Sequence, residues 1–176
     1  MSLTLPIHGR GTSDNPANRF ERLRIEENWD DVPPGDRPAP RTEFFRDVTR
    51  SIIARNDSPD IPFDFSLNPY RGCEHGCIYC FARPGHEYLS LSAGLDFETK
   101  IFVKHDAPRL LRQELMRDSW KPAAITISGV TDCYQPAERL FRLTRQCLEV
   151  LLKFRNPTTI ITKSALVTRD IDILSE

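Results

Sequence analysis

The sequence lacks the features that would place it in a membrane or on a polyanion. No apolar stretch is long enough to span a bilayer, and the N-terminal MSLTLPIHGRG has no apolar segment behind a basic start, as a signal peptide would. The chain also has no excess of positive or negative charge, because 24 basic and 25 acidic residues give a formal net charge of -1. No net field therefore draws the chain to nucleic acid or to anionic lipid. We expect a soluble, globular, cytoplasmic protein with no membrane partner.

Cysteine is scarce, and the cysteines present do not suit a disulfide framework. The chain has five, an odd number, and three of them crowd into eight residues. Disulfide frameworks are typical of small exported proteins with paired cysteines. Without an export signal, thiolates that bind a metal are the better interpretation.

Regular periodicity is missing from the first 60 residues. They hold seven of the 14 prolines, nine arginines and no lysine, and no helix or strand period continues for long. We expect residues 1–60 to form an irregular arm and residues 61–176 to form the core domain. Within the arm, the segment FFRDVTRSIIAR has enough apolar residues to dock on other parts of the protein.

The remaining sequence alternates between strand and helix patterns. Alternating residues at 63–67 and short apolar runs at 124–130 and 158–164 predict strands, and the alternation in FETKIFVK predicts another. Helices are predicted after Asp106 and over LFRLTRQCLEVLLKF, which carries an apolar stripe. This order favours an α/β fold with parallel strands and right-handed crossovers.

The stretch NPYRGCEHGCIYCFARP carries the three crowded cysteines, Cys73, Cys77 and Cys80. Gly72 and Gly76 permit the tight curl that three converging thiols need. A cluster of four irons is normally held by four thiolates. Three thiolates leave one iron open, and an open iron can bind a substrate or a cofactor.

Two other interpretations of this loop stay open. A zinc site could use His75, His86 or Cys133 as its fourth ligand, although zinc sites usually use two separated pairs of ligands. An electron-transfer cluster could use Cys133 or Cys147, but Cys147 falls within a predicted amphipathic helix and suits a small core residue. Either case would describe a zinc- or iron–sulfur-stabilised binding module without catalysis.

The spacing C-x3-C-x2-C, with Tyr79 directly before the last cysteine, resembles the signature of the radical S-adenosylmethionine (radical SAM) superfamily. The wider text, SLNPYRGCEHGCIYCFARP followed by SAGLDFETKIFVK, resembles an uncharacterised bacterial subgroup related to spore photoproduct lyase. The resemblance implies a [4Fe-4S] cluster on Cys73, Cys77 and Cys80, with S-adenosylmethionine (SAM) chelating the fourth iron. It also implies reductive cleavage of SAM to a 5'-deoxyadenosyl radical, with electrons from a reductant such as flavodoxin or ferredoxin.

With this resemblance, the predicted fold is the amino-terminal part of a partial (β/α)6 TIM-type barrel, preceded by the irregular arm. Three parallel strands would leave the edge of the last strand uncovered. We therefore expect the chain to be truncated, with the core domain incomplete at its C-terminal side.

Ligands of parallel β/α folds collect at the carboxyl ends of the strands. The resemblance carries Thr131 over as a polar contact to SAM, Asp132 as a partner for its ammonium, and Lys163 as a cation near its carboxylate. It places Tyr79 beside the adenine. The alternatives are loop capping for Asp132, a lysine that extends into solvent for Lys163, and packing of the loop for Tyr79.

Two departures from the photoproduct lyase pattern limit the predicted function. Phe81 stands where that enzyme has a tyrosine, and Gly129 stands where it has a hydrogen-donating cysteine. Cys133 is the candidate catalytic residue that could replace this donor. The substrate stays unknown, and the charge balance gives no support to nucleic acid.

Overall fold

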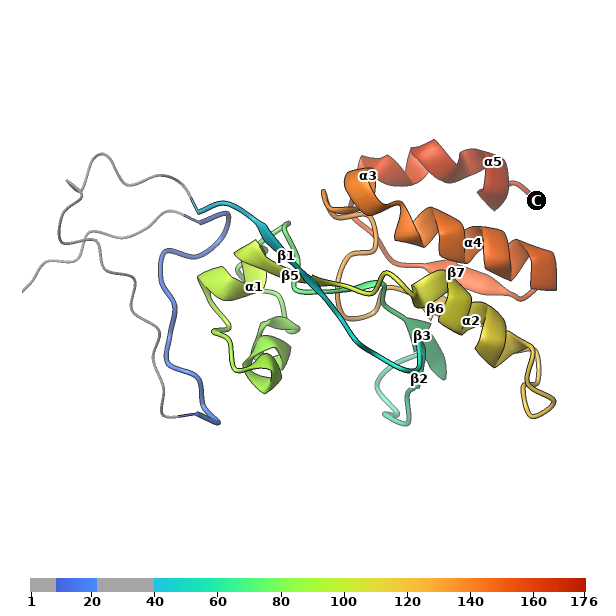
Figure 1. Cartoon of the computed structure of the whole chain (residues 1–176), viewed down its shortest axis with the longest axis horizontal. Coiled ribbons are helices and arrows are strands. Elements are labelled where there is room, and N and C mark those ends of the chain that lie inside the picture. The colour runs from blue at the N-terminus through green and yellow to red at the C-terminus, as the bar shows by residue number, and fades with distance from the viewer. Residues whose placement is uncertain (1–8, 22–39) are drawn as a thin grey trace, which may run out of the picture. The chain divides into compact units, whose positions relative to one another are not determined.

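A computed structural model describes residues 9–21 and 40–176, which divide between two compact units (Figure 1). Of the described residues, the first unit contains 9–21, 40–44 and Gly72–Ile101, and the second contains Phe45–Arg71 and Phe102–Glu176. The described part of the expected arm is therefore shared by both units. Its remaining parts, 1–8 and 22–39, lie outside the described residues.

The second unit is built on a four-stranded sheet. Its strands lie in the order β2 (Ile53–Arg55), β3 (Phe65–Leu67), β6 (Ile125–Ile127) and β7 (Thr158–Ile160). β3, β6 and β7 are parallel, whereas β2 runs antiparallel to β3. The apolar runs that predicted strands near 63–67, 124–130 and 158–164 thus form three neighbouring parallel strands.

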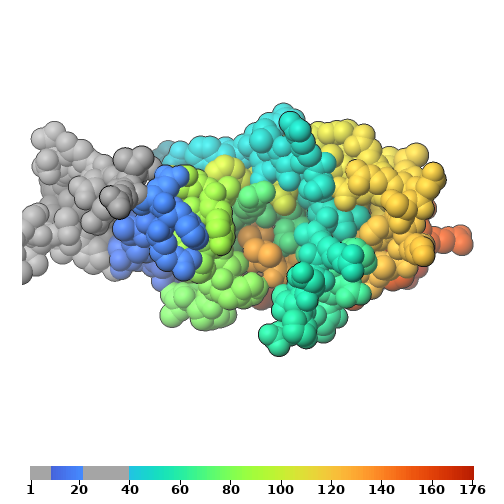
Figure 2. All heavy atoms as spheres, turned by 90° about the horizontal axis from the view of Figure 1, so that it is seen from below, coloured from blue at the N-terminus to red at the C-terminus, as the bar shows by residue number. Residues whose placement is uncertain are grey.

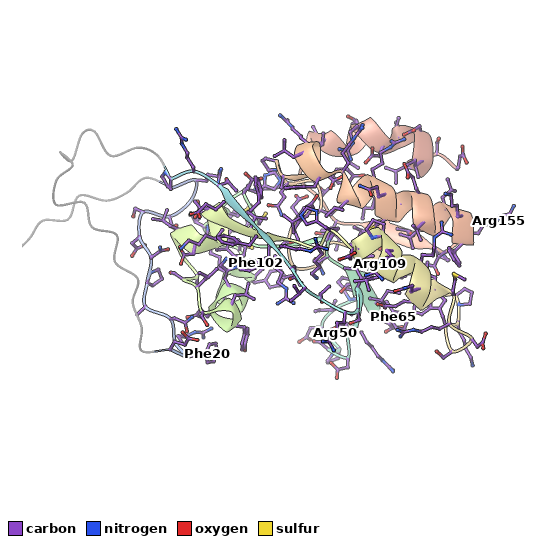
Figure 3. The ribbon with its side chains drawn as sticks, viewed as in Figure 1. Phe20, Arg50, Phe65, Phe102, Arg109 and Arg155 are labelled. Carbon is purple, nitrogen blue, oxygen red and sulfur yellow. The ribbon has the colours of Figure 1, made fainter. Side chains whose placement is uncertain are left out.

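Two helices supply most of the core against this sheet. α2 (Ala107–Leu115) and α4 (Leu143–Phe154) pack on each other, and their leucines meet strand residues such as Leu67 and Ile127. Phe65 of β3, labelled in Figure 3, meets the Trp120 ring edge-on, with the ring centroids 5.1 Å apart. Burial of these apolar side chains is the main source of stability here.

The segment expected to form one helix, LFRLTRQCLEVLLKF, is interrupted. α3 (Glu138–Phe141) ends at Arg142, which adopts a left-handed conformation with φ of 52°, and α4 begins at the next residue. After β7 the chain forms the 3-10 helix η3 (Ala165–Asp170) and the short helix α5 (Ile171–Leu174).

The first unit has little regular structure. After the cysteine loop come the 3-10 helix η2 (Arg83–Leu89) and the short helix α1 (Leu95–Thr99). A three-stranded sheet, whose residues are divided between the two units, has the order β1 (Glu43–Arg46), β5 (Lys100–Val103) and β4 (Tyr70–Arg71), with β4 antiparallel to β5. The chain passes from one unit to the other within β1 and within β5.

The prediction of a partial (β/α)6 TIM-type barrel is wrong. The described strands belong to two small mixed sheets, and neither sheet closes into a barrel within residues 9–21 and 40–176. The reason lies in strand pairing. β2, from the proline-rich first 60 residues, adds antiparallel to β3, and β5 pairs with β4 outside the parallel sheet. Among the helices of the described part, none is long and apolar enough to cross a membrane.

Candidate functional site

The cysteine loop is wound by successive tight turns. The carbonyl of Cys73 accepts the N–H of Gly76 at 3.1 Å, and the carbonyl of Cys77 accepts the N–H of Cys80 at 3.2 Å. Gly76 has φ of 61° and Gly72 has φ of 77°, in the left-handed region that favours glycine. These turns bring three cysteines onto one short curl of backbone.

The three thiols suit a metal cluster by their chemistry, although the loop does not hold them as a finished metal site. Cys73 is buried, Cys77 and Cys80 are half-buried, and all three are free of disulfides. Cys73 packs with Ala82 and Phe97, and Cys80 packs against the same small cluster. Within the described residues, no three His, Cys, Asp or Glu side chains lie close enough to hold a metal ion.

Arg83 holds the cysteine loop from inside. Its guanidinium donates to the carbonyl of Gly76 at 2.8 Å and to the carbonyl of Cys77 at 2.9 Å. The same group forms an ion pair with Glu98 at 2.7 Å and lies 5.1 Å from the centroid of the Phe97 ring. Both members of the pair are buried.

Residues 9–21 lie along the first unit, beside this pair. Figure 2 shows this segment, in blue, against the yellow-green residues of the same unit. The backbone N–H groups of Arg10 and Gly11 donate to one oxygen of Glu98, at 2.6 and 2.9 Å. Farther along, Phe20, labelled in Figure 3, stacks on Tyr88 with the ring centroids 4.8 Å apart.

Among the histidines weighed as zinc ligands, His86 is enclosed in the first unit. It is 2% exposed and meets the Phe97 ring edge-on at 5.6 Å between centroids. Burial lowers the pKa of His86 to about 4, so the imidazole is neutral at neutral pH. His75 is half-buried within the cysteine loop itself.

In the second unit, the loop after β6 is fixed by its own polar side chains. Thr131 is buried, and its hydroxyl donates to the carbonyl of Tyr70 at 3.0 Å. Asp132 accepts from the N–H of Tyr134, the hydroxyl of Thr162 and the N–H of Lys163, at 2.8, 2.7 and 3.0 Å. Asp132 thus ties the loop after β6 to the loop after β7. Capping of this kind is the alternative that the sequence left open for Asp132.

The other residues singled out in the sequence differ widely in exposure. Tyr79 and Phe81 of the cysteine loop are 83% and 76% exposed, and Lys163 is also exposed. Gly129 has φ of 103°, and a Cβ added there would lie 3.1 Å from the ring of Phe63. The backbone there therefore favours glycine and leaves little room for the cysteine of the lyase pattern.

Cys133 lies in the hydrophobic core of the second unit, where it is fully buried together with Cys147. Burial raises the pKa of the Cys133 thiol well above its ordinary value. Donation of hydrogen from this thiol to a substrate would require the core around it to open.

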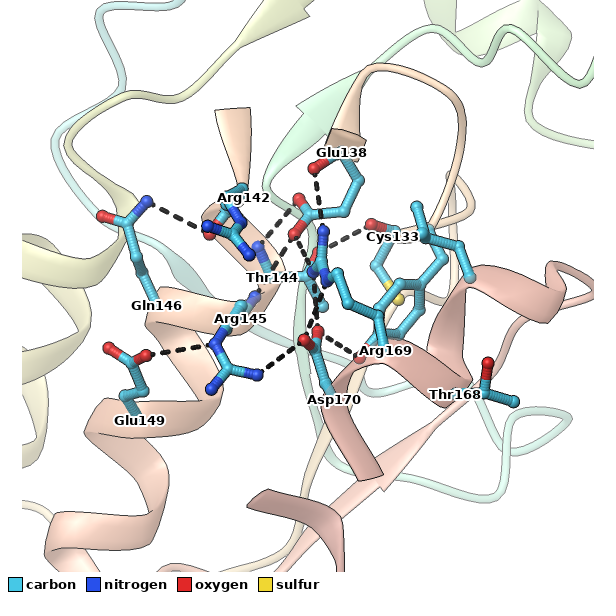
Figure 4. A network of polar contacts seen from close by, with 12 residues as sticks. Cys133, Glu138, Arg142, Thr144, Arg145, Gln146, Glu149, Thr168, Arg169 and Asp170 are labelled. Carbon is cyan, nitrogen blue, oxygen red and sulfur yellow. Dashed lines mark hydrogen bonds and ion pairs between the residues drawn. The ribbon is translucent and has the colours of Figure 1, made fainter. Parts of the chain in front are cut away.

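A buried polar network, absent from the sequence predictions, joins α3, α4 and η3 (Figure 4). The fully buried carboxylate of Glu138 accepts the Tyr70 hydroxyl at 2.5 Å and pairs with Arg169 at 2.8 Å. Asp170, also fully buried, pairs with Arg169 and with Arg145 at 2.6 and 2.9 Å. Burial alone would raise the pKa of Asp170, but hydrogen bonds from the two arginines outweigh it and lower the pKa.

A hollow in the second unit has a volume of about 380 Å³ and is bordered by Phe63, Asp64, Thr126, Thr159 and Ile161 among others. Its lining includes none of Thr131, Asp132 and Lys163. Phe63, which borders the hollow, also lies next to Gly129.

Comparison with known proteins gives relatives but no function. The chain is 41% identical to an uncharacterised protein of Mycobacterium tuberculosis over 116 residues. The matched region covers 66% of this chain and 34% of the relative. An uncharacterised protein of Methanocaldococcus jannaschii is 32% identical over 112 residues, or 64% of this chain and 40% of the relative. An uncharacterised protein of Acidianus two-tailed virus is 29% identical over 119 residues, or 64% and 38%.

The chain thus spans about a third of the length of the mycobacterial relative and somewhat more of the other two. No family model matches it, and no solved structure matches it.

Proposed function

We propose that this chain is part of a radical SAM protein related to spore photoproduct lyase, in which Cys73, Cys77 and Cys80 bind a [4Fe-4S] cluster. The cluster, when bound, supplies the electron for reductive cleavage of SAM, and the substrate of the resulting enzyme is unknown. A cytoplasmic location and a reductant such as flavodoxin or ferredoxin belong to the same proposal.

The observation that carries this proposal is the cysteine loop. Three thiols that form no disulfide stand at C-x3-C-x2-C spacing on one curl whose glycines adopt left-handed conformations. Thiolates are the ligands that iron–sulfur clusters use, and a set of three leaves one iron open to a further ligand. Cys133 and Cys147, the only other cysteines of the chain, belong to the core of the other unit.

In this proposal the chain's own residues bind and orient SAM. The exposed ring of Tyr79 offers a face for the adenine, and the exposed ammonium of Lys163 offers a charge for the carboxylate of SAM. Thr131 and Asp132 would contribute through the loop that they shape, since their side chains already bond to the protein.

The proposal is tested by anaerobic reconstitution with iron and sulfide, followed by EPR of the reduced protein with and without SAM. We expect close to four irons and four sulfides per chain and a signal that changes when SAM is added. A reduced-cluster signal that SAM leaves unchanged would count against SAM binding.

The competing function is a binding module stabilised by zinc or by an iron–sulfur cluster, without catalysis. Metal analysis after aerobic and anaerobic purification separates the two. Zinc without iron or sulfide under both conditions would favour the zinc module.

Within the radical SAM proposal, the reaction differs from photoproduct repair. Phe81 has no hydroxyl hydrogen to give, and Gly129 has no side chain. We expect formation of 5'-deoxyadenosine from SAM without release of thymidines from a spore photoproduct dinucleotide. Chromatography of both products in one anaerobic reaction decides between these outcomes.

A further inference from the structure

The first unit contains an ion pair that is placed to control the shape of the cysteine loop. Arg83 is 7% exposed and Glu98 is 0% exposed, with 2.7 Å between guanidinium nitrogen and carboxylate oxygen. Buried ion pairs contribute little net stability compared with apolar residues of the same volume, because both charges lose their hydration. Such pairs often fix one conformation of the chain. The groups that hydrogen-bond to the pair therefore indicate which conformation it fixes.

Every N–H of the Arg83 guanidinium has a partner. One Nη2 bond goes to Glu98, the other goes to the carbonyl of Gly76, and Nε donates to the carbonyl of Cys77. Nη1 donates to the carbonyls of Ala93 and Gly94, both at 3.1 Å. Arginine offers five such donors in a rigid plane, which lysine cannot reproduce. The orientation of the backbone at Gly76 and Cys77 is therefore set by this one side chain.

The Glu98 carboxylate is equally well used. One oxygen accepts from Arg83 and from the hydroxyl of Thr12 at 3.0 Å, and the other accepts the N–H groups of Arg10 and Gly11. Burial alone would raise the pKa of Glu98, but these hydrogen bonds, with that of Arg83 first, outweigh it and keep the group ionised. The pair thus joins residues 10–12 to the cysteine loop.

The contact between these two segments also requires glycine on one side. A Cβ placed on Gly11 would lie 1.7 Å from the carbonyl oxygen of Gly76, far inside van der Waals contact. The N-terminal segment can approach the loop backbone this closely only because residue 11 has no side chain. The close approach and the ion pair fix the same part of the loop, between Cys73 and Cys77.

We infer that Arg83 and Glu98 are positioning residues that hold the cysteine loop in the conformation from which its three thiols bind metal. This inference rests on the metal-binding part of the proposed function, although not on the identity of the metal or on SAM cleavage. Groups that orient metal ligands typically affect metal affinity by about 10- to 100-fold. If the ion pair only stabilised the fold, its removal would lower stability but would leave the number of thiolates bound per metal ion unchanged.

The test compares Arg83→Lys and Glu98→Gln with Arg19→Gln in the full chain. Arg19 pairs with Glu87 in the same unit, at 2.6 Å from its Nε, but does not touch the cysteine loop, so it is a matched control. Each metal-free protein is titrated with Cd²⁺, and the thiolate-to-metal absorption counts the thiolates bound per ion. Iron and sulfide contents are then measured after anaerobic reconstitution.

For Arg83→Lys and Glu98→Gln we expect a Cd²⁺ affinity about 10- to 100-fold weaker and fewer thiolates per ion, with circular dichroism showing a folded chain. Arg19→Gln should match the wild type. If the wild type binds Cd²⁺ through three thiolates but forms no iron–sulfur cluster, the proposed function fails while the inference can still hold. If the wild type forms the cluster and both variants bind Cd²⁺ and iron as the wild type does, the inference fails alone.

A measurement on the wild type covers the case in which the variants do not fold. In metal-free protein, hydrogen exchange at the amides of Gly76 and Cys80 should be slowed to a degree comparable with the amides of α1, since both belong to turns that Arg83 holds. Exchange at the rate of an unstructured loop would show that the pair does not order the cysteines, and would overturn the inference.

Discussion

At the scale of single residues, the five cysteines fall into two groups with different expected behaviour. If the proposed function is right, replacing Cys73, Cys77 or Cys80 with serine removes a thiolate that nothing else can supply, so each variant should lose the iron–sulfur cluster. Cys147→Ser should retain it, because Cys147 is fully buried in the core of the second unit. Burying a hydroxyl there should lower the free energy of unfolding by about 1–3 kcal/mol. Iron content and urea unfolding of the four variants test this assignment. Loss of the cluster in Cys147→Ser, with the cluster kept in the other three variants, would contradict it.

A second residue-scale prediction concerns pH. The folded-state pKa of His86 is about 4, below the ordinary 6.5, so the unfolded chain takes up a proton before the folded chain does. The contribution of neutral His86 is therefore complete above about pH 6.5 and is lost as the pH falls from there toward about 4. Between about pH 7 and about pH 5 the loss should approach 2 kcal/mol.

Urea unfolding of metal-free protein at these two pH values measures the effect. His86→Gln should show a smaller loss of stability than the wild type, because glutamine does not titrate. His105→Gln is the control for replacing a histidine outside the first unit, since His105 is exposed in the second unit. Equal pH dependence in the wild type and His86→Gln would contradict the prediction.

Spacing along the chain was enough to find the cysteines, because three thiols in eight residues form a pattern that needs no tertiary contact. It was not enough to find Arg83 and Glu98. These two residues are 15 apart in the sequence and read there as ordinary charged residues. What distinguishes them is complete burial with every polar atom used, and local pattern does not report burial of a charge.

At the scale of secondary-structure elements, Glu138 is the residue on which the start of α4 depends. Its carboxylate accepts the N–H groups of Thr144 and Arg145 at 3.0 and 3.3 Å, in the first turn of α4, where the helix has no side-chain cap of its own. The same carboxylate accepts the Tyr70 hydroxyl. It also pairs with Arg169, as Figure 4 shows. A carboxylate near a helix N-terminus also interacts favourably with the helix dipole.

Glu138→Ala should therefore lower the free energy of unfolding by about 3–5 kcal/mol, as expected when one member of a buried ion pair is removed. Glu149→Ala, on α4 itself, is the control. Glu149 is 48% exposed and its oxygen lies 3.4 Å from Arg145, so its loss should change stability by less than about 1 kcal/mol. Urea unfolding followed by circular dichroism compares the two, and similar losses would show that Glu138 is not the cap of α4.

Alternating and apolar runs located the strands of the parallel sheet. Burial on both faces explains the continuous apolar signal of β6 but not that of β7, which is half-buried to exposed. The same approach missed the break between α3 and α4. Arg142 has no local feature that predicts a positive φ; its conformation follows from Glu138, which draws the first N–H groups of α4 toward itself. A hydrophobic period in the sequence does not predict a helix end that depends on a side chain outside that helix.

At the scale of the whole molecule, the barrel prediction failed because a strand pattern does not specify a strand's partner. β2 comes from the first 60 residues, where no strand was expected, and it adds antiparallel to the edge of the parallel sheet. β5 falls within the segment FETKIFVK that predicted a strand, yet it joins β4 and β1 instead. Pairing depends on contacts between residues far apart in sequence, and these appear only in the folded chain. The two compact units, each built from separate stretches of sequence, are a consequence of such contacts.

The division into two units leads to a prediction about how ligands stabilise the chain. The three loop cysteines, Cys73, Cys77 and Cys80, belong to the first unit. Thr131, Asp132 and Lys163 belong to the second. A ligand stabilises the part of a protein that it binds, so iron–sulfur reconstitution alone should slow hydrogen exchange at 72–82 and leave α4 unchanged. Addition of SAM should then slow exchange at 128–132 and 162–164.

Lys163→Met should reduce only this second effect, and Lys153→Met, on α4, should reduce neither. Exchange mapped by mass spectrometry in the metal-free, reconstituted and SAM-treated states measures both steps, and protection of 128–132 that is already complete without SAM would contradict the assignment of these loops to SAM.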